Sequence, residues 1–162
     1  MRVAVISDTH LPHGGRRLPD ACVERLRDSD LILHAGDLVA ASVLDDLEAF
    51  GPPVHAVHGN MDEAALRERL PETHVVDVRG LRLAMTHDAG PRAGREERLA
   101  RRFPGCAAVV YGHTHEPQVA RVEEVWILNP GSPTERRRAP SHTMLMLQIG
   151  DGEIEPELVQ LS

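Results

Sequence analysis

The stretch Gly112-His113-Thr114-His115 places two imidazoles two residues apart, directly after the apolar run of residues 107–111. An apolar run of this length predicts a buried strand, and extended residues two apart face the same side. Gly112 would allow the backbone to turn sharply where the strand ends. Neutral imidazole is a good ligand for zinc, copper, iron and nickel. The pair alone is weak evidence for a metal site, because a surface loop can hold two histidines by chance.

Four further apolar runs of strand length also end in side chains that carry oxygen or nitrogen. In chain order these ends hold Asp8 with His10, Gly36-Asp37, Gly59-Asn60 and Thr86-His87. α/β sheets form their sites at the carboxyl ends of strands, so these side chains could converge. Carboxylate, amide and imidazole ligands suit two divalent ions better than a structural zinc held by sulfur.

Each of these residues has an ordinary explanation when it is taken singly. Asp8 and Asp37 are typical turn residues, and His87 could be a hydrogen-bonded polar residue. The metal-site interpretation rests on their joint occurrence at five strand ends. Six other histidines keep the ordinary interpretation: His13, His34, His55, His58, His74 and His142. Of these, His34 and His58 lie near the ligand loops but could equally be buried and hydrogen-bonded.

The order of elements predicts a mixed α/β fold. Strands are expected at 2–6, 31–34 and 54–57, alternating with helices at 21–27, 43–50 and 63–70. This alternation predicts parallel strands with right-handed crossovers. Asp20 and Ser42 are the expected N-caps of the first two helices. From residue 73 onward three hairpins are expected, at 75–85, 119–128 and 143–161, with a helix at 94–103.

Bulk properties exclude several classes of protein. With 162 residues and no linker or repeat, the chain is expected to form a single domain, residues 1–162. The net charge is −7, from 25 acidic and 18 basic residues, and every basic residue is Arg. An acidic chain is poorly suited to nonspecific nucleic-acid binding. Aromatic residues make up 2% of the sequence, so a stacking platform for single strands is not expected either.

Two cysteines, Cys22 and Cys106, are far apart in the sequence and are expected to be reduced, buried thiols. The N-terminal apolar run, residues 1–6, is too short for a signal peptide, and no membrane span is visible. These features predict a cytoplasmic protein without a membrane partner.

The motifs at residues 8–10, 36–37, 59–62, 86–87 and 112–115, followed by Asn129-Pro130-Gly131-Ser132, stand in one order. This order resembles that of the calcineurin-like metallophosphoesterases. The short chain is similar to the small phosphodiesterase branch, which also contains the retromer small subunit. The resemblance covers residues 1–132. It implies two packed mixed β-sheets with helices on both outer faces, a four-layer α/β/β/α fold.

The resemblance also implies a dinuclear metal site. Asp37 would bridge two divalent ions, which in such sites lie about 3.5–4 Å apart. Asp8, His10 and His115 would complete the first metal site, and Asn60, His87 and His113 the second. The implied activity is a metal-dependent phosphodiesterase, in which a hydroxide that bridges the ions attacks the phosphorus. Manganese is the favoured ion, with nickel, iron, cobalt and zinc left open.

Three departures from the family pattern bear on catalysis. Many relatives have a general-acid His directly after the ligand Asn, where this chain has Met61. Asp62 is the candidate replacement, with His13 as another, so the candidate catalytic residues are Asp37, Asn60 and Asp62. The usual His-Gly-His reads His87-Asp88-Ala89. The basic run 136–138 could bind phosphate through Arg137, although arginine runs are more often solvated surface.

Two other functions compete with the phosphodiesterase. One is a catalytically weak or inactive scaffold for protein–protein interaction, as the retromer small subunit suggests; the loss of a His at Met61 favours it. The other is a nuclease, which the short chain and the acidic charge disfavour. The expected partner is a small phosphodiester or nucleotide-like substrate, with no stable nucleic-acid binding. Homo-oligomerisation and the natural substrate are left open.

Overall fold

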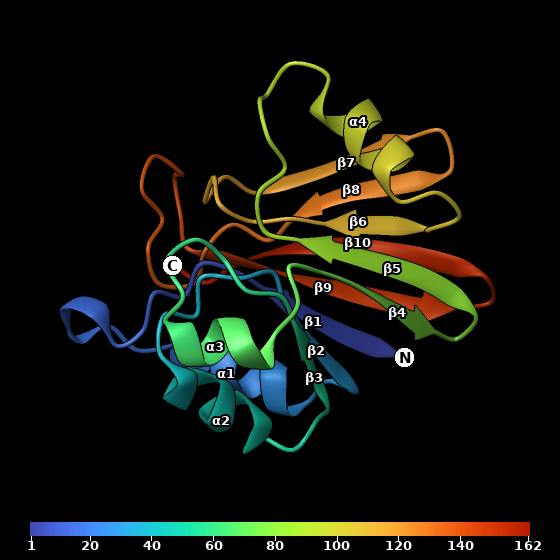
Figure 1. Ribbon diagram of the computed structural model, residues 1–162. Coiled ribbons are helices and arrows are strands. Elements are labelled where there is room, and N and C mark those ends of the chain that lie inside the picture. The colour runs from blue at the N-terminus through green and yellow to red at the C-terminus, as the bar shows by residue number, and fades with distance from the viewer.

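Two five-stranded sheets face each other in the computed structural model, which describes residues 1–162 (Figure 1). The first sheet has the order β10-β9-β1-β2-β3 and the second β4-β5-β6-β8-β7. The first contains β1 (Arg2–Ile6), β2 (Leu31–His34), β3 (Val54–Ala56), β9 (Thr143–Gly150) and β10 (Glu153–Gln160). The second contains β4 (Thr73–Val78), β5 (Leu81–Thr86), β6 (Ala108–Val110), β7 (Gln118–Val122) and β8 (Val125–Asn129).

Helices cover the outer faces of both sheets. They are α1 (Asp20–Arg27), α2 (Ala41–Glu48), α3 (Ala64–Arg69) and α4 (Arg95–Arg102). The 3-10 turn η1 (His13–Gly15) lies in the loop after β1 and has no buried residue. Figure 1 shows α1, α2 and α3 together on the side of the first sheet, and α4 on the opposite side over the second. The expected α/β/β/α layering is therefore confirmed.

The side chains of β1 alternate between two layers of the core. Val3 and Val5 pack between the two sheets, whereas Ala4 and Ile6 pack in the cluster beneath α1 and α2. Successive side chains of a strand point to opposite faces. A strand covered on both faces must therefore be apolar throughout, as β1 is. A third cluster joins Leu99 of α4 to the outer face of the second sheet.

The strand pairing agrees with the prediction of parallel strands in the first part of the chain and hairpins from residue 73 onward. β1, β2 and β3 are parallel, and the three predicted hairpins are present as β4–β5, β7–β8 and β9–β10. β9 runs antiparallel to β1, so the C-terminal hairpin completes the first sheet. In the second sheet β6 is parallel to both β5 and β8. Both sheets are therefore mixed.

The predicted N-caps were wrong for both helices. Asp20 is the first residue of α1, after Pro19, and Ser42 lies inside α2, after Ala40. For α2 the oxygen comes from a distant residue, since the Ala41 N–H donates to Glu63 Oε1 at 2.7 Å. A local pattern cannot reveal a cap that lies more than twenty residues further along the chain.

The two cysteines are buried and free, as predicted. Cys22 is a buried residue of α1 and packs toward the first sheet, and Cys106 packs below α4. Burial raises the pKa of the Cys22 thiol to about 12. None of the helices has the length and apolar character needed to cross a bilayer.

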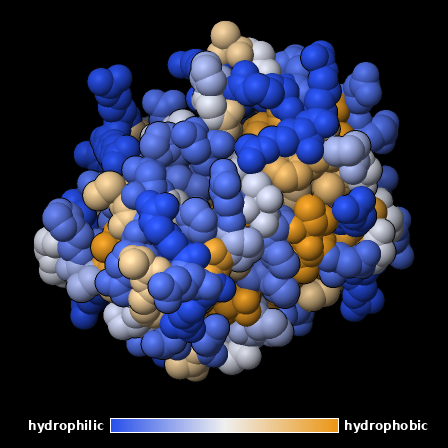
Figure 2. Space-filling view, in the orientation of Figure 1, coloured by the Kyte–Doolittle hydropathy of each residue, from blue (hydrophilic) through white to orange (hydrophobic).

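The face in Figure 2 is dominated by hydrophilic side chains, with apolar residues in separate small groups. Four large hydrophobic side chains of the chain are exposed, and Met61, at 55%, is the most exposed of them. Single exposed apolar side chains are common on globular proteins. Met61 differs because it follows a predicted metal ligand.

Replacing Glu63 with Ala should lower the free energy of unfolding by about 1 kcal/mol, because the first turn of α2 loses its oxygen acceptor. Urea denaturation measures the loss. Glu68→Ala, at an exposed position of α3, is the matched control and should change the free energy by less than about 0.5 kcal/mol. Equal effects of the two variants would contradict the capping role.

Candidate metal centre

The carboxyl ends of five strands deliver the seven predicted ligands. Three of these strands belong to the first sheet and two to the second. The ligands are Asp8 and His10 after β1, Asp37 after β2, Asn60 after β3, His87 after β5, and His113 and His115 after β6. The structure brings all seven together, because each has an atom within 4 Å of another member. The site therefore lies where the ends of both sheets meet.

Asp8 lies at the centre of the first group, which also contains His10 and His115. Its Oδ2 accepts from Ser7 Oγ at 2.6 Å and from the His113 N–H at 3.0 Å. Its Oδ1 faces imidazole nitrogens only. The Nε2 atoms lie at 3.4 Å for His115 and at 3.8 Å for His10. One oxygen is thus fixed by the fold and the other is directed at the predicted ligands.

Asp37 is divided in the same way between the backbone and the histidines. Its Oδ1 accepts from the Met61 N–H at 2.9 Å. Its Oδ2 lies 3.3 Å from His10 Nε2 and 3.3 Å from His87 Nε2. His10 and His87 were predicted to hold different metals. The position of Oδ2 between them fits the predicted bridging carboxylate.

Asn60 connects the two histidines of the second group. Its Oδ1 lies 3.1 Å from His87 Nε2 and 3.2 Å from His113 Nδ1. Asp8 also lies near this group, with its Oδ1 at 3.9 Å from His87 Nε2. The structure therefore places Asp8 close to both groups, whereas the family resemblance implies a place in the first alone.

Three atoms at the centre support the presence of a cation. Asp8 Oδ1, His10 Nε2 and His115 Nε2 are buried and have no hydrogen-bond partner. Leaving a buried polar atom without a partner is costly. A divalent cation would satisfy all three atoms together, and it suits this set of carboxylate and imidazole ligands. The residues present therefore fit the metal that the fold implies.

The carboxylates and imidazoles alter one another's pKa values. Burial would raise the pKa of Asp8 and Asp37, but the neighbouring imidazoles outweigh it and hold both pKa values well below the usual range. His10 acts on both carboxylates, with His115 beside Asp8 and His87 beside Asp37. Burial lowers the pKa of His10, but Asp37 and Asp8 raise it to about 9. Metal binding at this site must displace protons, so it should weaken as the pH falls.

Backbone carbonyls orient two of the imidazoles. His87 Nδ1–H donates to Ala35 O at 2.7 Å, and His115 Nδ1–H donates to Glu135 O at 2.5 Å. A carbonyl only accepts, so in the neutral imidazole the Nε2 lone pair is left for a metal. The Glu135 carboxylate lies 3.7 Å from His10 Nδ1 and 3.4 Å from Arg16 Nη2.

Glu135 was missed by sequence reasoning. Its backbone and its side chain reach two different ligands, yet no spacing in the sequence marks it. The only signal is its place three residues after the motif that ends at Ser132.

Residues 129–134 connect the loops that carry the ligands through hydrogen bonds. Ser132 Oγ donates to Asp8 O at 2.8 Å, and Thr134 Oγ1 donates to Thr9 O at 2.6 Å. Asn129 Nδ2 donates to Gly112 O at 3.2 Å. The conformations of the β1 and β6 loops are therefore coupled through the segment that follows β8.

Asp62 is buried and accepts three backbone hydrogen bonds. The donors are the N–H groups of Val39 at 2.6 Å, Gly59 at 2.7 Å and Asp37 at 3.2 Å. This geometry holds the Asp37 and Asn60 loops together. It engages both carboxylate oxygens, which fits a positioning role better than proton donation. The other candidate acid, His13, is exposed in η1.

His34 is a buried structural residue. The Gly36 N–H donates to His34 Nδ1 at 3.1 Å, which leaves Nε2–H to donate to Thr9 Oγ1 at 3.1 Å. Burial lowers the pKa of His34 to about 3. The ordinary interpretation of this histidine, as a buried and hydrogen-bonded residue, is confirmed.

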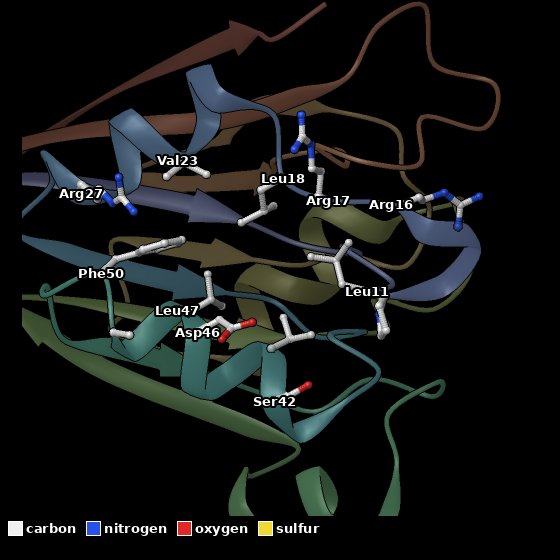
Figure 3. A pocket seen from close by; sticks show the side chains of 13 residues that line it. Leu11, Arg16, Arg17, Leu18, Val23, Arg27, Ser42, Asp46, Leu47 and Phe50 are labelled. Atoms are coloured by element: carbon white, nitrogen blue, oxygen red, sulfur yellow. The ribbon is translucent and has the colours of Figure 1, made fainter.

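The arginine run divides into two environments. Arg136 Nη1 donates to Ala139 O at 2.8 Å. Arg137 and Arg138 line a cavity of about 310 Å³ with Thr114, next to the histidine loop. A larger cavity of about 490 Å³ lies between α1 and α2, with Leu18, Val23 and Phe50 in its walls (Figure 3). None of the seven predicted ligands lines this larger cavity.

Comparison with known proteins agrees with this geometry. Residues 1–152 match a calcineurin-like phosphoesterase superfamily domain. A protein named probable metallophosphoesterase from Methanothermobacter thermautotrophicus is 35% identical over 162 residues, covering 99% of this chain and 92% of the relative. A phosphodiesterase from Methanocaldococcus jannaschii is 29% identical over 146 residues, covering 81% and 83%. Wild-type Vps29 of Entamoeba histolytica, in a crystal structure with Zn²⁺, has a TM-score of 0.78 at 26% identity, covering 100% of both chains.

The chain belongs to the calcineurin-like phosphoesterase superfamily, as its motifs predicted. Its curated relatives are named metallophosphoesterase and phosphodiesterase, which supports a phosphoester hydrolase with candidate metal ligands. Its fold is shared with Vps29.

Replacing Gly59 with Ala should weaken manganese binding by about 10- to 100-fold. A Cβ at this position would overlap Asp37 Oδ1 and would lie 2.6 Å from the Asp37 nitrogen, so Asp37 would have to move. Isothermal titration measures the affinity. Gly150→Ala is the matched control, because a Cβ there has no neighbour within 4 Å. Unchanged binding by the Gly59 variant would contradict the assignment of Asp37.

The stability of the metal-free chain should rise with pH between about 3 and 6.5, partly because of His34. Below pH 6.5 the unfolded chain protonates this histidine, whereas the folded chain, with a pKa of about 3, does not. His34 therefore adds a slope of up to about 1.4 kcal/mol per pH unit. In urea denaturation His34→Gln should flatten the curve, and His13→Gln, at an exposed site, should not. Equal slopes for both variants would refute this origin.

Proposed function

We propose that the protein is a phosphodiesterase that hydrolyses a small phosphodiester with the help of two divalent ions, manganese being the favoured one. The observation that carries this proposal is the group of buried, unpartnered ligand atoms on Asp8, His10 and His115 at the strand ends. The names of the curated relatives support the same activity. We expect one domain, residues 1–162, acting in the cytoplasm.

The seven ligands divide into two sets around Asp37. Asp8, His10 and His115 would hold the first ion with Asp37, while Asn60, His87 and His113 would hold the second with the same carboxylate. When bound, two such ions neutralise the phosphoryl oxygens and lower the pKa of the attacking water. The Asn60 oxygen is neutral, so it limits the negative charge that an anionic substrate meets.

The surrounding residues hold this arrangement in place. The carbonyls of Ala35 and Glu135 fix the orientation of His87 and His115. The Asp62 carboxylate joins the backbones of Asp37 and Gly59. Preorganisation of this kind matters because metal and substrate geometry must hold within about 0.5 Å.

The residue at position 61 limits which leaving groups the protein can release efficiently. Met61 cannot donate a proton to a leaving alcohol, and general acid catalysis is typically worth about 10²–10⁴-fold. The three backbone hydrogen bonds to Asp62 make it a poor substitute donor. We infer that the protein prefers substrates whose leaving group has a low pKa, or that it turns over slowly.

A scaffold is the second candidate function. The same exposed Met61 and the fold shared with Vps29 favour it. The complete set of converging ligands opposes it, because a scaffold has no need of buried atoms that lack partners. A nuclease is disfavoured, since the net charge of −7 opposes binding to a polyanion.

Replacing Asp37 with Asn should reduce hydrolysis of bis(p-nitrophenyl) phosphate by at least about 10³-fold in the presence of manganese, because both metal sites lose their shared carboxylate. Asp151→Asn, in the exposed turn between β9 and β10, is the control and should retain activity. Full activity of the Asp37 variant would refute the shared role. Two equivalents of bound manganese without turnover in the unmodified protein would favour the scaffold.

A further inference from the structure

A polar cavity of about 290 Å³ opens beside the second group of ligands. Eight residues line it and none of them is hydrophobic. In this it differs from the cavity between α1 and α2, where seven of the thirteen lining residues are hydrophobic. A cavity without an apolar wall is suited to a ligand that hydrogen-bonds over most of its surface.

The cavity is continuous with the candidate metal centre. Asn60 and His87 line it and are also two of the seven predicted ligands. Their facing atoms, Oδ1 and Nε2, are 3.1 Å apart. A phosphodiester whose phosphorus lies at the metal centre would therefore extend one of its alcohol groups into this cavity.

One cation is fixed in the wall of the cavity. Arg67 Nε donates to Asp62 O at 3.1 Å and Arg67 Nη2 donates to Asn60 O at 2.8 Å. The guanidinium is thereby tied to the loop that carries Asn60. Its remaining N–H groups are donors that a ligand can use.

Two carboxylates from other elements also line the cavity. Glu72 precedes β4 and Asp88 follows β5, and both are exposed. Arg67, Glu72 and Asp88 together carry a net charge of −1, and the His58 imidazole also lines the cavity. A second anionic group would gain little here. Hydroxyl groups can both donate to the carboxylates and accept from Arg67, so they match the lining.

We propose that this cavity is the subsite for one alcohol moiety of the substrate, and that this moiety is a neutral polyol such as a glyceryl or sugar group. The inference rests on the proposed phosphodiesterase function and adds the class of substrate to it. An alkyl group in the same place would desolvate charged side chains without replacing their hydrogen bonds, which is unfavourable.

The experiment compares three symmetrical diesters: bis(glyceryl), dibutyl and bis(2-carboxyethyl) phosphate. In each of them both alcohols are the same, so the orientation of binding does not matter. The manganese-loaded protein is used, and phosphorus NMR follows the formation of the monoester. The glyceryl diester should have the lowest KM, a comparison that depends less on the leaving-group pKa than kcat does. Preference for the butyl or the carboxyethyl diester would overturn the proposal.

A double variant, Glu72→Gln with Asp88→Asn, tests the residues that carry the inference. It should lower the ratio of kcat/KM for the glyceryl diester to that for the butyl diester by about tenfold, the loss expected for one hydrogen bond to a charged group. Asp46→Asn, in the cavity between α1 and α2, is the matched control and should leave the ratio unchanged. An unchanged ratio in the double variant would contradict the assignment.

A binding measurement separates this proposal from the proposed function. Calorimetry with glyceryl phosphate and butyl phosphate should show tighter binding of the glyceryl compound, and the double variant should remove the difference. If bis(p-nitrophenyl) phosphate is not hydrolysed, the phosphodiesterase fails, but this comparison still decides the subsite. Equal binding of the two monoesters would overturn the subsite, whatever the activity.

Discussion

Two carboxylates, Asp8 and Asp37, are buried at the strand ends, and the surrounding loops are arranged to pair them. Each has one oxygen held by donors from the fold and the other directed at imidazoles. Buried charges are tolerated only when they are paired and hydrogen-bonded. The strand ends of two sheets must therefore bring four histidines to the same place. Glycine at position 59 follows from this crowding, because a Cβ there would occupy the space of the Asp37 carboxylate.

The predicted metal ligands come from both sheets. The first sheet supplies the carboxylates and the second supplies three of the four histidines. The loops that carry these ligands lie far apart in the sequence, so hydrogen bonds across the site must hold them together. Ser132 and Glu135 connect to the β1 and β6 loops, and Asp62 connects the β2 and β3 loops. These connections explain how short, irregular segments can hold ligands in a fixed geometry.

Local pattern located the candidate ligands at strand ends, whereas the layer order and the division of the ligands between two metals were implied by the family resemblance. Apolar runs mark buried strands, and the residue after each run marks a strand end. The connecting residues could not be predicted in this way. Glu135 acts on His115 through its backbone carbonyl, which every residue type possesses. Glu63 satisfies the start of α2 from across a loop and a strand, so the local pattern pointed to Ser42 instead. The sequence makes Asp62 a candidate proton donor. It cannot reveal the three backbone N–H groups that donate to the Asp62 carboxylate.

Asp37 is proposed to lie between two metal ions. Anomalous scattering from a crystal of the protein grown with manganese tests this proposal most directly. If Asp37 bridges the two ions, the map should show two peaks about 3.5–4 Å apart, with one Asp37 oxygen between them. His10 and His115 should lie at one peak, and His87 and His113 at the other. A single peak, or two peaks that do not share Asp37, would contradict it.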